Sequence, residues 1–288
     1  MSNQSSNRYE ELQFNHIEEA DIRILPHTKH AIKNDCERIK VLSNDTDVLV
    51  VLLHHWDNLK KIGLKELWIR LGVGNTTRQV PVHTLAERLD ICHVLPALHF
   101  LTGSDCTSKF GTKHAAITNT PNTYLANFGI TGANNKYSIE EQVKLAEEYL
   151  VQVLKRGSHC KTMDELRFNI YTQSKNVSID KLPPTSKSVK LHILRAFYHT
   201  HLYQTCLDDN VNHIKLDPTH YGYEDAGDCL HPVRVTSLFP DINELVPSCS
   251  CLKCARESCL CFSAGIACII YCHCKSVAIP ECRNKYCM

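Results

Sequence analysis

A dense run of cysteines near the C-terminal end constrains this chain most strongly. Ten of its sixteen cysteines lie between residues 249 and 287. From Cys249 to Cys282 they follow the spacing C-x-C-x2-C-x4-C-x-C-x6-C-x3-C-x-C-x7-C. The chain begins without the apolar segment of a signal peptide, and no stretch reaches the roughly 18 apolar residues of a membrane span. We therefore expect a protein of the nucleus or the cytoplasm, not secreted, whose thiols bind metal and do not form disulfides.

The number of thiols predicts a cluster of about three zinc ions. Three tetrahedral ions need about twelve ligand positions, and nine thiolates fill them if six bind one ion each and three bridge two ions. Cys287 lies beyond this set and is expected to be spare. The expected ligands are Cys249, Cys251, Cys254, Cys259, Cys261, Cys268, Cys272, Cys274 and Cys282.

Basic residues accompany the cysteines, and two roles remain open for them. In one interpretation they only offset the negative charge of the thiolates. In the other they also contact the phosphates of a nucleic acid, which must then bind locally because the whole chain has a net charge of only +1. The residues concerned are Lys253, Arg256, Lys275, Arg283 and Lys285.

The cysteine run resembles the CXC domain of the tesmin family. The likeness lies in C-x-C-F-x2-G-x2-C-x3-C-x-C, with Phe262 and Gly265 at the family's positions, and in the closing Cys282-x-Asn284. The resemblance implies zinc binding, and the family binds DNA through tandem copies. This chain has one copy, a shorter spacing between Cys251 and Cys254, and Ser258 where the family has a DNA-reading tyrosine. Zinc binding is therefore the firmer expectation.

Short β-branched runs alternate with helical patterns before residue 110. Residues 38–43 and 67–72 predict strands, while helices are expected at 16–33, after the NDTD segment, and at 82–101. Such alternation is typical of an α/β layer with a mostly parallel sheet. Pro26 is expected to kink or split the first helix.

Helical patterns continue after residue 110. Ser138 and Glu141 form a capping box that predicts the start of a long helix, and further helices are expected at about 163–172 and 186–206. Paired histidines such as His199 and His201, and scattered cysteines such as Cys106, are expected to be structural.

Acidic residues recur at three places in the first 110 residues. Carboxylates at the carboxyl ends of parallel strands gather at one edge of the sheet, where Mg²⁺ or Mn²⁺ would find oxygen ligands and two ions could hold a scissile phosphate. Alternatively, Asp45 and Asp47 cap the following helix, and the acids of residues 18–21 belong to a helix N-terminus. The candidate residues are Glu19, Asp21, Asp45, Asp47 and Asp105.

The order of these acids resembles the flap-endonuclease branch of the PIN-domain nucleases. That family carries E-A-E/D, D-x-D-x-L and L-x-G-x-D, matched here by residues 19–21, 45–49 and 101–105. The resemblance implies that the five carboxylates are catalytic residues of a Mg²⁺- or Mn²⁺-dependent phosphodiesterase acting on DNA or RNA. The segments VPVHTLAERLD and LPALHFLTGSD resemble uncharacterised PIN-like proteins with a similar cysteine tail, which implies a transposon-derived origin.

Nucleases of that family also need an N-terminal strand with an aspartate and a second acid from a helical arch, and the segment before residue 16 supplies neither. The expected fold is therefore α/β, with a partial PIN-like parallel sheet. Two functions follow: a zinc-binding, nucleic-acid-associated protein without catalysis, which we favour, or a structure-selective nuclease. No membrane partner is expected.

The expected order of domains along the chain is a disordered N-terminus at 1–15, a partial PIN-like domain at 16–110, a helical extension at 111–206, an irregular connector at 207–247 and a CXC-like zinc domain at 248–288.

Overall fold

The computed structural model describes most of the chain between residues 19 and 284. The chain divides into two units, one formed by residues 1–163 and 188–234 and the other by residues 164–187 and 235–288. The boundary expected near residue 110 therefore lies inside the first unit, and the segment 1–15 lies outside the described residues. The residues that the structure describes are 19–132, 135–173, 178, 181–208, 216–235, 249–251, 254, 258–263, 267–268, 272–276 and 282–284.

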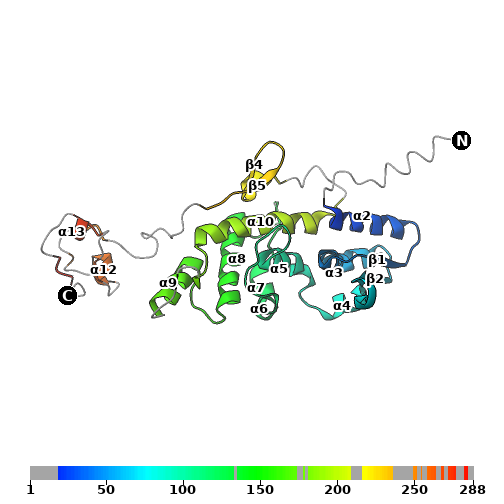
Figure 1. Cartoon of the computed structure of the whole chain (residues 1–288), viewed down its shortest axis with the longest axis horizontal. Coiled ribbons are helices and arrows are strands. Elements are labelled where there is room, and N and C mark those ends of the chain that lie inside the picture. Colours follow the sequence, from blue (N-terminus) through cyan, green and yellow to red (C-terminus); the bar gives the residue numbers. More distant parts are fainter. Residues whose placement is uncertain are drawn as a thin grey trace. The chain divides into compact units, whose positions relative to one another are not determined.

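A small mixed sheet forms one layer of the first unit (Figure 1). Strand β1 (Arg38–Leu42) pairs in parallel with β2 (Glu66–Leu71), and β2 pairs in antiparallel with β3 (Arg78–Pro81). The prediction of a mostly parallel sheet is wrong for β3, which runs antiparallel to β2. Only the short turn η1 (Gly74–Thr76) separates β2 from β3, and so short a connection joins antiparallel neighbours, whereas parallel strands need a longer crossover.

Helix α3 (Thr46–Lys61) supplies the crossover between the two parallel strands. It buries Val51, Leu52 and Trp56 in the core of the unit. Helix α2 (Ala20–Lys33) packs against α3. Pro26 lies buried inside α2, which the structure shows as one helix, so the proline does not split it.

The single helix expected at 82–101 is divided in two. Helix α4 (Val82–Arg88) ends before η2 (Cys92–Val94), and α5 (Leu95–Thr102) begins after it. Pro96 lies in the first turn of α5. A proline is tolerated there because the first N–H groups of a helix have no intrahelical acceptor, whereas it would break a continuous helix.

Helices α6 (Lys113–Thr118), α7 (Pro121–Leu125) and α8 (Ile139–Leu154) complete the first unit, together with α10 (Ser186–Thr205) from its third residue on. The predicted capping box of α8 is confirmed, because Glu141 N donates to Ser138 Oγ at 3.2 Å and Ser138 N donates to Glu141 Oε2 at 2.8 Å. Two histidine contacts join α10 to the rest of the core. His192 Nε2 lies 2.9 Å from the carbonyl oxygen of Leu101, and His55 Nε2 lies 2.7 Å from that of Tyr203.

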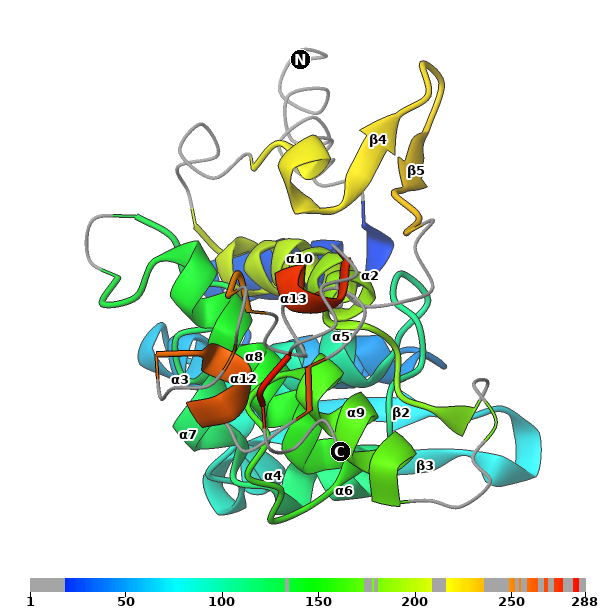
Figure 2. The same cartoon turned by 90° about the vertical axis from the view of Figure 1, so that its left-hand side faces the viewer.

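A small hairpin follows α10 and packs against it (Figure 2). The turn η5 (Pro218–Tyr221) leads into β4 (Tyr223–Asp225), which pairs with β5 (Leu230–Pro232). The rings of Phe197 and Tyr221 stack with centroids 5.5 Å apart. This region was expected to be irregular, since strands of three residues are too short to show an alternating pattern.

The second unit contains helix α9 (Met163–Gln173) from its second residue and the cysteine-rich segment. Asp164 and Ser186, which both belong to this unit, exchange two hydrogen bonds of 3.0 Å. The cysteine-rich segment contains the short helices α12 (Leu260–Ser263) and α13 (His273–Ser276). Within the described residues, none of the helices combines the length and the apolar character that a membrane span requires.

Candidate metal centres

Two helix N-termini bring three predicted carboxylates together. Asp21 lies in the first turn of α2, Asp45 is the N-cap residue of α3, and Asp47 lies in the first turn of α3. One oxygen from each of the three side chains lies within 4.8 Å of the other two. The positive ends of both helix dipoles favour negative charge here. We call these three residues the acidic triad.

The capping alternative is confirmed for Asp45 and explains only part of this geometry. Asp45 Oδ1 accepts a hydrogen bond from Asp47 N at 2.9 Å, and Ser43 Oγ accepts one from Asp45 N at 3.0 Å. These bonds fix the turn between β1 and α3. A carboxylate has several acceptor positions, so a capping aspartate can still bind a cation. The other half of that alternative is also confirmed, because Asp21 lies in the first turn of α2. Neither role requires Asp21 to lie beside Asp45 and Asp47, which belong to the start of another helix.

The predicted acids influence one another electrostatically. Burial raises the pKa of Asp21, and the charges of Asp45, Asp47, Glu19 and Asp105 raise it further, in that order. All five predicted carboxylates therefore belong to one region of negative charge. A bound divalent cation would offset this repulsion, because opposite charge favours the ionised form of each acid.

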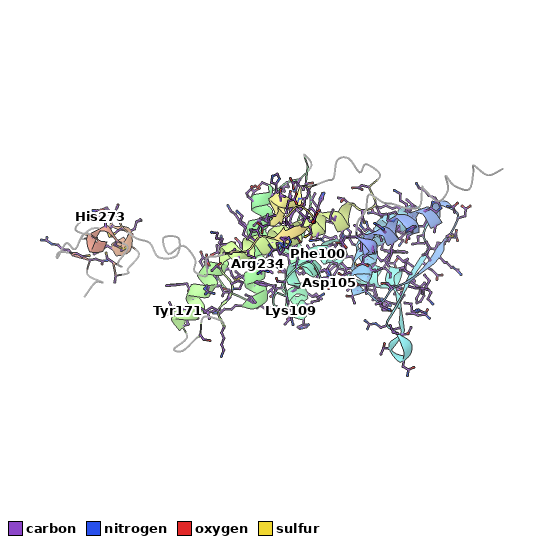
Figure 3. The ribbon with its side chains drawn as sticks, turned by 45° about the horizontal axis from the view of Figure 1, so that its top comes forward. Phe100, Asp105, Lys109, Tyr171, Arg234 and His273 are labelled. Atoms are coloured by element: carbon purple, nitrogen blue, oxygen red, sulfur yellow. The ribbon has the colours of Figure 1, made fainter. Side chains whose placement is uncertain are left out.

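Asp105 lies in a turn after α5 (Figure 3). Ser104 and Thr107 close this turn through a backbone hydrogen bond of 3.2 Å from Ser104 N to Thr107 O. Gly103, which ends α5, has φ of 113°, and a Cβ there would lie 2.6 Å from Lys109 Cα. Only glycine suits this position, which explains the glycine in the L-x-G-x-D segment.

The sequence analysis did not predict that His99 belongs to the acidic region. His99 Nε2 lies 3.0 Å from Asp47 Oδ2, and its side chain is only 4% exposed. Lys113 Nζ lies 3.4 Å from the other ring nitrogen of His99. Burial acts to raise the pKa of Asp47, but contact with His99 and the charge of Lys113 outweigh it, so the pKa is lowered. Nothing in its local spacing set His99 apart from the other histidines.

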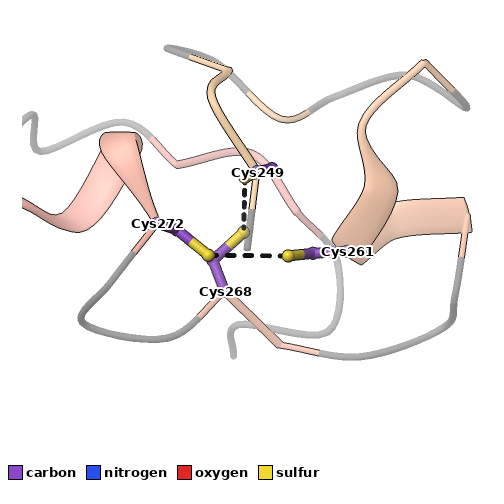
Figure 4. Close-up of side chains that lie close together, drawn as sticks. All are labelled: Cys249, Cys261, Cys268 and Cys272. Carbon is purple, nitrogen blue, oxygen red and sulfur yellow. Dashed lines mark hydrogen bonds between the residues drawn. The ribbon is translucent and has the colours of Figure 1, made fainter. Parts of the chain in front are cut away.

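The predicted zinc ligands gather into one buried cluster. Figure 4 draws four of them, Cys249, Cys261, Cys268 and Cys272. Seven of the nine cysteines are buried, and Cys251 and Cys282 pack against them. The sulfurs form three overlapping groups of four, and within each group all sulfurs lie within 4.8 Å of one another. This arrangement is compatible with binding of a metal such as zinc. The groups are Cys249, Cys261, Cys268 and Cys272; Cys249, Cys251, Cys254 and Cys259; and Cys249, Cys254, Cys268 and Cys274.

The sulfurs are close without being bonded as disulfides. Cys249 Sγ lies 3.3 Å from Cys254 Sγ and 3.8 Å from Cys268 Sγ, and the described cysteines are free thiols. Asn284 Nδ2 donates to Cys268 Sγ at 3.3 Å, which places the asparagine of the closing Cys-x-Asn motif at the cluster. Burial raises the pKa of Cys249, so its thiol keeps its proton in the metal-free chain.

The basic residues of the tail fall mostly outside the described residues. Arg283 is described, and it is exposed. Lys253, Arg256 and Lys285 lie outside the described part, as do Cys287 and the side chain of Lys275. Both interpretations of these cations, charge neutralisation and phosphate contact, therefore stay open.

Comparisons with protein-family models, with curated proteins and with solved structures found no significant match to this chain. The resemblances to PIN-like nucleases and to CXC domains therefore remain predictions from sequence motifs. The acidic triad and the cysteine cluster follow from the positions of the side chains and do not depend on either resemblance.

Proposed function

We propose that this chain is a zinc-binding protein whose C-terminal module holds three zinc ions. The observation that carries the proposal is the overlap of the three cysteine groups. Cys249, Cys254 and Cys268 each belong to more than one group, whereas every other member belongs to one. Shared thiolates are the expected bridges between neighbouring ions, and three of them are what nine ligands around three ions require.

Each ion then receives two bridging and two terminal thiolates. The third ion takes Cys282 in place of Cys249, because Cys249 already bridges two ions and Cys274 interacts with the thiols of Cys254, Cys268 and Cys282. The proposed ligand sets are Cys249, Cys254, Cys251 and Cys259 for the first ion; Cys249, Cys268, Cys261 and Cys272 for the second; and Cys254, Cys268, Cys274 and Cys282 for the third.

Zinc content tests this assignment. Elemental analysis of the full chain should give about three zinc ions in addition to any bound elsewhere. Replacing the bridging Cys268 by serine should release more zinc than replacing the terminal Cys251, because the bridge serves two ions. Cys287→Ser is the matched control and should retain the full content. Equal losses from C268S and C251S would contradict the bridging scheme.

We further propose nucleic acid as the partner of this module. Nine thiolates and three Zn²⁺ leave about three negative charges, and five basic residues accompany them in the sequence. The surplus of cations and the resemblance to CXC domains support contact with phosphates. A gel-shift titration at two salt concentrations tests it: affinity should fall at higher salt, and Arg283→Gln should reduce this salt dependence. Binding that does not respond to salt would contradict phosphate contact.

A second candidate function is divalent-cation-dependent hydrolysis of phosphodiesters. The convergence of Asp21 with Asp45 and Asp47 supports it, because carboxylate oxygens from two helices form a ligand set suited to Mg²⁺ or Mn²⁺. The bound cation would polarise the phosphate, while His99 would hold the carboxylate of Asp47 in place. In this candidate function the metal is a resident cofactor and the nucleic acid is the substrate.

Cleavage of flap and single-stranded substrates tests this second function. The double variant Asp45→Asn/Asp47→Asn removes two charges and keeps an N-cap residue, because asparagine caps helices as well as aspartate does. It should lose cation-dependent cleavage, while Asp57→Asn, an exposed position on the same helix, should keep it. Cleavage that the double variant retains would exclude the acidic triad as its source.

A further inference from the structure

A second group of possible metal ligands lies beside the acidic triad and differs from it in chemistry. A carboxylate oxygen of Glu19, the sulfur of Cys106 and a ring nitrogen of His199 lie within 4.8 Å of one another. Glu19 precedes α2, Cys106 lies in the turn after α5, and His199 lies on α10. Three segments that are distant in the sequence therefore present an oxygen, a sulfur and a nitrogen to the same point.

His199 is the most informative member of this group. It is 8% exposed, its Nε2 lies 2.8 Å from Tyr223 Oη, and its buried Nδ1 has no hydrogen-bond partner among the described residues. If Nε2–H donates to the tyrosine oxygen, Nδ1 is left with a free lone pair. Metal-binding histidines commonly show this arrangement, in which one nitrogen donates to an oxygen and the other binds the ion.

The charges around the group also favour a cation. A neutral imidazole is the form that binds a metal ion, and the buried, unpartnered Nδ1 of His199 offers such a nitrogen. Cys106 follows Asp105 in the turn after α5, and Glu19, Asp21 and Asp47 belong to the same region of negative charge. A metal ion that replaced the thiol proton would offset this accumulation of negative charge.

We propose that Glu19, Cys106 and His199 form a binding site for a divalent transition metal of the zinc type. Thiolate and imidazole ligands favour zinc, whereas the acidic triad offers only the oxygens that Mg²⁺ and Mn²⁺ prefer. Ligand atoms around tetrahedral zinc lie roughly 3.3 to 3.8 Å apart, so small side-chain movements would close the site. Three protein ligands leave a fourth position for water or a substrate oxygen. This site goes beyond the proposed functions and needs neither the zinc cluster of the tail nor hydrolysis.

Thiol labelling with iodoacetamide tests the site in the full chain. Peptide mass spectrometry reports each cysteine separately, so the tail thiols do not obscure Cys106. We expect Zn²⁺ to slow alkylation of Cys106 by roughly tenfold or more, because a metal-bound thiolate is shielded from the reagent, and a chelator to restore the rate. Mg²⁺ alone should have no effect. Cys36 is an exposed free thiol outside every cysteine group described above, and its rate should be the same throughout.

Variants of the other two ligands complete the test. Glu19→Gln and His199→Gln should each abolish zinc protection of Cys106, while His220→Gln, at an exposed histidine, should preserve it. Glu19 is only half buried, so its variant keeps the test valid if the change at His199 disturbs folding. Labelling of Cys106 at the same rate with and without Zn²⁺ overturns the proposal, as does protection that survives both ligand variants.

The same experiment separates this site from the proposed functions. Protection of the tail cysteines without protection of Cys106 rejects this site alone and leaves the zinc cluster intact. Protection of Cys106 that persists in Asp45→Asn/Asp47→Asn assigns the ion to Glu19, Cys106 and His199. Protection lost in that double variant would assign the ion to the acidic triad and overturn the proposal.

Discussion

His99 Nε2 lies 3.0 Å from Asp47 Oδ2, and both side chains are largely shielded from solvent. The contact joins helix α5 to the first turn of α3, where the acidic triad lies. It positions one carboxylate of the triad and lowers the pKa of Asp47 against the opposing effect of burial. An acid that stays ionised while buried is what a cation ligand requires.

We expect the contact between His99 and Asp47 to make a pH-dependent contribution to the free energy of unfolding. A carboxyl group whose pKa is lowered by folding stabilises the protein above its unfolded value of about 3.9, and this contribution is lost as the pH falls through the folded pKa. His99→Leu should therefore reduce the free energy of unfolding by about 1 to 3 kcal/mol at neutral pH, with less loss at acidic pH. Urea unfolding at a series of pH values measures it, and His114→Leu, at an exposed histidine, is the control. A loss that does not change with pH would contradict the assignment to Asp47.

The contribution of Asp21 to stability should change with pH in the opposite direction to that of Asp47. Its pKa is raised by burial and by its acidic neighbours, so its ionised form destabilises the folded chain, and stability increases as the pH falls through the folded pKa. Asp21→Asn should therefore raise the melting temperature when no divalent cation is present. The same change should weaken Mg²⁺ or Mn²⁺ binding by roughly tenfold or more, because it removes a charged ligand. Calorimetric melting and titration calorimetry measure both effects, and a lower melting temperature without cation would contradict the electrostatic account.

Gly103 should not tolerate a side chain. Its φ of 113° is a conformation that L-residues rarely adopt, and a Cβ would lie 2.6 Å from Lys109 Cα. Gly103→Ala should lower the free energy of unfolding by more than about 1 kcal/mol and displace the turn that carries Asp105 and Cys106. Gly132 also has a positive φ, but a Cβ there would meet no atom within 4 Å. Gly132→Ala therefore measures the cost of backbone strain without a steric clash. Equal stability of the two variants would show that the clash is relieved at no cost.

Removal of zinc should act on the tail alone. The described part of the tail is packed mainly around its own cysteines, so chelation should unfold it. Hydrogen exchange read by mass spectrometry should then speed up in peptides covering residues 249–284 and stay unchanged in those covering α3 and α8. Those two helices are buried in an apolar core that contains none of the tail cysteines. Faster exchange in α3 or α8 after chelation would contradict the prediction.

The sequence predicted the elements whose signal is local. The strands β1 and β2 and the helices α3 and α8 appear close to their expected places, because β-branched runs, hydrophobic periodicity and caps act over a few residues. Strand β3 and the hairpin of β4 and β5 were missed, since their few residues show no pattern before they pair with a neighbour. The break between α4 and α5 could have been expected from Pro96.

The same distinction holds for the candidate sites. The cysteine spacing by itself determined the nine thiols that gather in the tail, because all of them lie in one short segment. Only the tertiary structure decided that Asp21 meets Asp45 and Asp47, that His99 contacts Asp47, and that Cys106 and His199, expected to be structural, share a point with Glu19. These side chains come from helices and turns far apart in the chain. Their meeting depends on how α2, α3, α5 and α10 pack together, and no local pattern in the sequence records that packing.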